Sequence, residues 1–89
     1  MAGQEVFRVS DFGFCAFLLV NGFALRDIAT DESSSRSKVF LLCGERSTFD
    51  VLAERFRVGD ARVDAREFLS AQRRLKHVLY GVRASAAIR

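Results

Sequence analysis

Apolar and polar positions along the chain predict a succession of short strands and helices. Residues 5–9 alternate weakly and fit a short edge strand. Residues 11–21 fit a first helix, with Ser10 as the residue that caps its start and Asn21-Gly22 as its end, because glycine readily adopts the left-handed conformation that follows a helix. This helix is apolar nearly all round, which is typical of a helix buried on several sides.

Two further strands are predicted to form a hairpin. Residues 23–30 place Phe23 and Leu25 on one face, and residues 38–43 contain the continuous apolar run Val39-Phe40-Leu41-Leu42-Cys43. The Ser-rich segment 31–37 joins them and is expected to be a flexible, solvated loop.

The rest of the chain predicts two amphipathic helices. The second helix is expected to run from Thr48 to about Arg57, started by Ser47 with Asp50 or by Thr48 itself, and to end at Gly59.

The third helix is predicted to begin after Asp64, its capping residue, and to end at Gly81, which leaves residues 82–89 as a C-terminal tail. Its apolar seam consists of Phe68, Ala71, Gln72, Leu75 and Leu79.

These elements predict one α+β domain over residues 1–89. A small β-hairpin, with residues 5–9 as the candidate third edge strand, packs against three helices, because a lone hairpin is marginal in water. Nine of the 89 residues are Phe and 49% are apolar, which excludes a disordered chain. The expected core comprises Phe17, Leu18, Phe40, Phe49, Phe56, Phe68 and Leu75.

The two cysteines, Cys15 and Cys43, are too few for a disulfide scaffold. Each lies in an apolar run, so we expect both thiols to be reduced and buried, in a reducing intracellular setting. A bond between them is the alternative if their segments pack side by side. The longest uncharged run, residues 12–25, is shorter than the roughly 20 residues of a membrane span, so no span is expected.

Residue types with catalytic chemistry are sparse. The single histidine, His77, lies on the polar face of the third helix without an acid at helical spacing. One histidine and two separated cysteines lack metal-ligand spacing, and the glycines form no phosphate-binding loop. We therefore expect no enzyme, no metal, no cofactor and no small-molecule substrate.

The one charged constellation is basic. Residues 1–53 carry seven acids and five bases, a net −2, whereas residues 54–89 carry nine bases and four acids, a net +5. On the third helix Arg66, Ser70, Arg73 and His77 share one stripe, with Arg74 beside it. Such a stripe can neutralise phosphates or meet an acidic partner. The alternative is the ordinary solvated face of an amphipathic helix.

Several short motifs also carry a family resemblance. They are Ala16-Phe17-Leu18, Gly22-Phe23-Ala24-Leu25, Val39-Phe40-Leu41-Leu42, Val63-Asp64-Ala65-Arg66-Glu67-Phe68 and Arg74-Leu75-Lys76. Their order resembles a family of short domains of unknown function found in bacteria and their phages, and it covers about residues 10–81. The resemblance implies a helix–hairpin–helix–helix fold and a phage or prophage source, and it transfers no catalytic residue.

Two functional hypotheses follow. The first is a non-catalytic structural or interaction protein, a small component of a virion-type assembly or a homo-oligomer, located in the bacterial cytoplasm or the virion. Its interface would be the apolar first helix, through Phe12, Phe14, Leu19 and Val20. The alternative is a nucleic-acid-binding accessory protein that uses the basic third helix, through Arg66, Arg73, Arg74 and His77.

Overall fold

The computed structural model describes residues 4–30 and 38–88, with the backbone alone for Thr30 and residues 81–88. The predicted flexible loop, residues 31–37, lies outside the described residues. The elements follow the order β1 (Gln4–Val9), α1 (Phe12–Val20), β2 (Ala24–Thr30), β3 (Lys38–Glu45), α2 (Arg46–Val58) and α3 (Ala65–Ile88). The predicted α+β class and the order of its elements are confirmed.

The strands form an antiparallel sheet in the order β1-β3-β2, so β3 is central and the predicted edge strand is confirmed. On one face of this sheet Leu42 pairs with Phe7 on β1 and with Leu25 on β2. The next residue pairs on that face join Phe40 to Val9 and to Ile28. A bulge in β2 between Leu25 and Asp27 lets Leu25 and Ile28, which are three residues apart, lie on the same face of the sheet.

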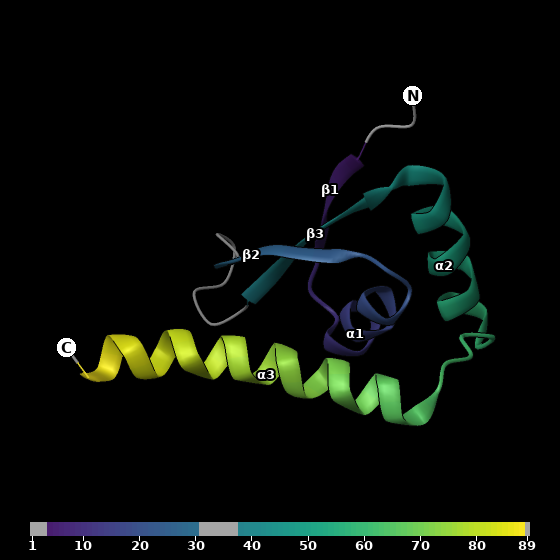
Figure 1. The fold of residues 1–89 in the computed structure, drawn as a ribbon. Helices are drawn as coiled ribbons and strands as arrows, with labels where there is room; N and C mark the ends of the chain where they lie inside the picture. Colours follow the sequence, from purple (N-terminus) through teal and green to yellow (C-terminus); the bar gives the residue numbers. More distant parts are fainter. Residues whose placement is uncertain (1–3, 31–37, 89) are drawn as a thin grey trace.

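The helices cover that face of the sheet, and α1 lies between the sheet and α3 (Figure 1). Three fully buried leucines join the layers: Leu42 from the sheet, Leu18 from α1 and Leu75 from α3. Of the predicted core, Phe17, Leu18, Phe40 and Leu75 are buried, and Phe49 and Phe68 pack at its border.

Phe56 is not part of the buried core, contrary to the prediction, because its side chain lies at the surface with 36% of its area exposed. It belongs to the last turns of α2, where that helix reaches past the core. Its ring still contacts the rings of Phe14 and Phe17 on α1, with centroid distances of 5.0 and 5.8 Å.

The start of α1 differs from the prediction by one residue. Asp11, not Ser10, caps the helix: its Oδ1 accepts a hydrogen bond of 2.8 Å from the backbone N–H of Phe14. That N–H belongs to the third helical residue, the position that a capping carboxylate reaches. At the other end Gly22 has a φ of 96°, as expected for the residue after a helix stop.

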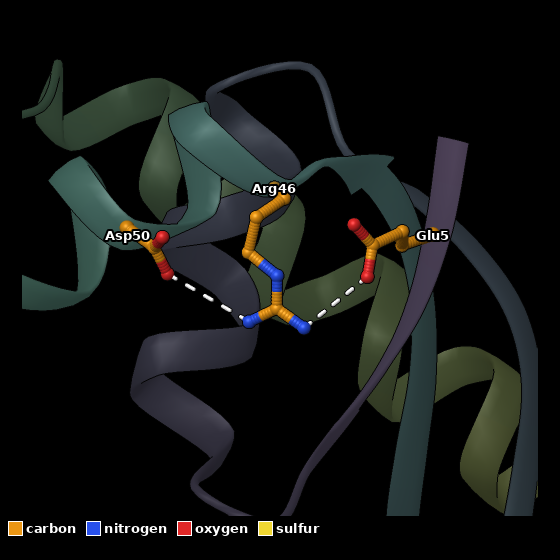
Figure 2. A network of polar contacts seen from close by, with 3 residues as sticks. All are labelled: Glu5, Arg46 and Asp50. Carbon is orange, nitrogen blue, oxygen red and sulfur yellow. Dashed lines mark hydrogen bonds and ion pairs between the residues drawn. The ribbon is translucent and has the colours of Figure 1, made fainter. Parts of the chain in front are cut away.

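The start of α2 also differs, because the helix begins at Arg46 directly after β3. The Glu45 carboxylate accepts hydrogen bonds from the hydroxyls of Ser47 and Thr48, at 2.9 and 3.2 Å. These hydroxyls therefore do not act as the predicted backbone caps. Arg46 ties the helix to β1, since its guanidinium reaches Glu5 at 3.2 Å and Asp50 at 3.8 Å (Figure 2).

The end of α2 at left-handed Gly59 and the capping of α3 by Asp64 are as predicted. The prediction that Gly81 ends α3 is wrong, because the helix continues to Ile88, so residues 82–88 are helical rather than a loose tail. A glycine inside a helix costs only about 1 kcal/mol relative to alanine. The residues that follow Gly81 include three alanines, the strongest helix formers.

Candidate interaction surfaces

The predicted interface on α1 is less open than its composition suggested. Phe12, Phe14, Leu19 and Val20 are all half-buried and pack against the core. The Phe12 ring lies 6.2 Å from that of Phe40, and Phe14 lies 5.8 Å from Phe49. None of these four predicted interface residues is fully exposed, because the sheet, α2 and α3 together surround the helix.

The last two residues of α1 nevertheless line a groove. Leu19 and Val20 form its apolar side, and the first turns of α3 form the other side with Arg66, Ser70 and Arg74. The groove has a volume of about 350 Å³ and also includes Glu67. It thus joins part of the predicted apolar interface to part of the predicted basic stripe, two sets that the sequence treated as rival surfaces.

The basic stripe itself is exposed along α3. Arg66, Ser70, Arg73, Arg74 and His77 all lie at the surface. Arg66 and Arg74 line the groove, whereas Arg73 and His77 do not, although helical spacing keeps both on the same stripe as Arg66, on the outer side of α3, away from the core.

Sequence reasoning missed two apolar neighbours of that outer side. Leu69 and Tyr80 are 52% and 55% exposed. Leu69 lies four residues before Arg73, and Tyr80 lies seven residues after it, so all three fall on one face. The spacing of Leu69 and Tyr80 from Arg73 could have been read from the sequence. The two residues were missed because they are not part of the Arg-Ser-Arg-His pattern.

Ion pairs between described side chains join Arg46 to Glu5 and Asp50, Arg57 to Glu54, and Arg62 to Asp60. These pairs lie outside α3. Within residues 65–80 the basic side chains form no ion pair, although Glu67 is nearby. The positive charge of this helix is therefore available to an external acidic group.

Two other hollows are lined by none of the predicted basic residues. A cleft of about 400 Å³ lies between β2, the start of β3 and the C-terminal half of α3, where Val78 and Leu79 line it. A shallower hollow of about 330 Å³ lies between α1 and α2 beside Phe14 and Phe56.

The two cysteines are free and lie in different environments. Cys15 is fully buried under the sheet, and this burial raises the pKa of its thiol to about 12. Cys43 is only half-buried, contrary to the prediction, because strand alternation turns it away from buried Leu42. Its Sγ donates a hydrogen bond of 3.4 Å to Gln4 Oε1. The alternative of a Cys15–Cys43 bond is thereby excluded.

The described part of the chain contains no group of three or more His, Cys, Asp or Glu side chains that could hold a metal ion. No helix within residues 4–30 and 38–88 is long and apolar enough to cross a membrane.

Comparison with known proteins identifies the family. The model of a domain of unknown function, DUF5659, matches residues 4–81, so the chain belongs to the DUF5659 family. The expected membership in a family of short domains of unknown function is confirmed. Neither a curated protein nor a solved structure matches the chain.

Proposed function

We propose that this member of the DUF5659 family is a non-catalytic interaction protein that binds an acidic, partly apolar segment of another protein in the groove between α1 and α3. The observation that carries the proposal is the composition of this groove. Leu19 and Val20 supply an apolar wall, and Arg66 and Arg74 supply two cations opposite it.

The groove favours a ligand that combines both chemistries. An apolar side chain placed against Leu19 and Val20 would remove further apolar area from water, at roughly 25 cal/mol per Å². A carboxylate beside it would meet Arg66 or Arg74, whose guanidinium groups can bind carboxylates through two parallel hydrogen bonds. Glu67 would repel a second acid placed too close and so restricts the position of the first.

The test uses short synthetic peptides that carry one large apolar residue next to one or two acids, read by fluorescence polarisation. Matched peptides with the acids replaced by Lys, or with the apolar residue replaced by Ser, serve as ligand controls. Arg66→Glu and Arg74→Glu should each weaken binding about tenfold, the loss expected for a charge-assisted pair worth about 1.4 kcal/mol.

Arg55→Glu is the matched control variant, because Arg55 is exposed on α2 and the substitution makes the same change in net charge. It should leave peptide binding unchanged. Equal losses in Arg55→Glu and Arg74→Glu would mean that only the net charge matters, and would contradict a groove-specific site.

A second candidate function, nucleic-acid binding, has its own observation. The outer side of α3 exposes Arg73 and His77 together with Tyr80, and Tyr80 can stack on a base or pack against a sugar. This arrangement supports phosphate contacts better than the sequence alone suggested, because the sequence showed no aromatic residue within the stripe.

The two candidate functions can be distinguished by the salt dependence of binding and by the effect of one variant. Nucleic-acid binding to a short duplex or single strand would fall steeply with salt, because each neutralised phosphate releases counterions. It would be weakened by Arg73→Glu, which lies outside the groove, whereas peptide binding in the groove would not. The virion-type assembly and phage source expected from the family resemblance remain predictions.

A further inference from the structure

The sheet has a second face, turned away from the core that Phe7, Phe40 and Leu42 enter. Strand alternation places Val6, Ala24, Val39, Leu41 and Cys43 on this face. Val39, near the start of β3, is buried, whereas Val6 is 52% exposed, Ala24 is exposed, and Leu41 and Cys43 are half-buried. We refer to the exposed part of this face, around Leu41 and Cys43, as the open face. Exposed apolar area on a sheet often marks an interface.

The charges on the open face are arranged symmetrically about its centre. Leu41 on the central strand pairs with Arg8 on β1 and with Asp27 on β2. A cation and an anion therefore flank the same leucine at opposite edges of the sheet. Both side chains are exposed, and neither forms an ion pair with any described residue.

We propose that the open face binds a second copy of this chain, with a two-fold axis that runs parallel to β3 and passes over Leu41. Such an axis places β1 of one copy opposite β2 of the other. Arg8 of each copy then meets Asp27 of the other, and Leu41 packs against its own symmetry mate. At the Arg8 and Asp27 positions the surface is thus complementary to itself, as an interface of this symmetry requires.

The alternative face-to-face arrangement has its axis across the strands. It would bring Arg8 against Arg8 and Asp27 against Asp27, so like charges disfavour it. The charge pattern consequently selects one orientation of the two sheets, close to the aligned packing that sheets adopt at about 10 Å separation.

The size of the open face limits the affinity. Three strands spaced about 4.8 Å apart present a face only roughly 15 Å wide. The area that such a narrow face can bury falls well short of the roughly 800 Å² per partner of a standard stable interface. We therefore expect a weak dimer that forms at high protein concentration, as for other small transient interfaces.

A charge-swap experiment tests the orientation. Sedimentation velocity at protein concentrations up to about 1 mM, a range suited to weak association, should show the native chain dimerising. Arg8→Asp and Asp27→Arg each turn two attractive contacts into two repulsive ones, so each variant alone should dimerise about tenfold more weakly. An equimolar mixture of the two variants should form a heterodimer, because one variant carries acids at both positions and the other carries arginines at both.

Circular dichroism establishes that both variants are folded, and a second measurement needs no variant. Cys43 lies on the central strand near the proposed axis, so the Cys43 thiols of the two copies face each other. A short bifunctional thiol reagent should link native chains through Cys43 and not through buried Cys15. The proposal is overturned by a native chain that stays monomeric at the highest concentration, by variants that dimerise as well as the native chain, or by a mixture that does not associate. A monomer would assign the open face to a different protein.

Discussion

The substitution Gly44→Ala tests how closely the core side chains are packed against the sheet. It lies on β3, on the helix side of the sheet, where the Phe23 ring covers its Cα. A Cβ at this position would lie 2.7 Å from Phe23 Cζ and still closer to Cδ2 and Cε2. The Phe23 ring itself is held by the rings of Phe7 and Phe49, with centroid distances of 6.0 and 6.2 Å. Gly44→Ala must therefore displace a buried ring rather than a flexible side-chain end.

Overpacking of this kind typically costs about 1–3 kcal/mol. In a domain of this size each kcal/mol lowers the melting temperature by roughly 4–8 °C, so thermal unfolding followed by circular dichroism should detect Gly44→Ala readily. Gly13→Ala is the matched control, because its Cβ would meet only ordinary contacts, 3.4 Å from Asp11 Oδ1 and 3.9 Å from Phe56 Cζ. It should be neutral or stabilising, since alanine is the better helix former.

A double-mutant cycle isolates the proposed clash. Phe23→Leu removes ring volume at the expense of packing, and in that background the added methyl group of Gly44→Ala should cost much less than in the native chain. The close approach of Phe23 to Gly44 is wrong if the melting temperature of Gly44→Ala lies within a degree or two of that of the native chain. It is also wrong if the losses of stability of Gly44→Ala and Phe23→Leu simply add in the double variant.

Three further predictions follow from named contacts. Asp11→Ala should lower the free energy of unfolding by about 1 kcal/mol in denaturant titration, whereas Ser10→Ala should have no effect, and the reverse order would restore Ser10 as the cap. Thiol labelling of the native chain should modify Cys43 alone and should modify both cysteines after denaturation; two fast thiols in the native state would contradict the burial of Cys15. Because burial raises the pKa of Cys15 from 9.0 to about 12, the unfolded thiol ionises first, so its contribution to stability is present below pH 9 and is lost as pH rises from 9 toward 12. Cys15→Ala should therefore reduce the slope of the free energy of unfolding against pH in this range, by an amount that corresponds to at most one proton. Identical slopes for the native chain and Cys15→Ala would argue against the raised pKa.

The sequence predicted the elements well because each carried a local signal. The apolar run of β3 and the helical seam through Leu75 identify their own secondary structure by periodicity. The misplaced boundaries arise where two signals compete. Ser10 and Asp11 are both good caps, and only the position of the chain over the sheet decides between them. At Gly81, local helix propensity on both sides overrides a residue that ends helices elsewhere in this chain.

The surfaces were harder to predict, because exposure depends on what packs nearby. The composition of α1 correctly indicated burial on several sides, but it could not show that the sheet, α2 and α3 together cover most of the helix. The groove joins Leu19 to Arg66 across 47 positions of sequence, and no local pattern reports that contact. The open face likewise depends on the register that sets Arg8 and Asp27 on either side of Leu41.

The most direct test of the proposed function is a nuclear magnetic resonance titration of the methyl groups with an acidic, apolar peptide. Binding in the groove predicts saturable shifts of the Leu19 and Val20 methyl signals, with the Leu69 methyl signals on the outer side of α3 unchanged. Shifts confined to Leu69, or no saturable shift of Leu19 and Val20 with any peptide of this class, would contradict the groove as the binding site.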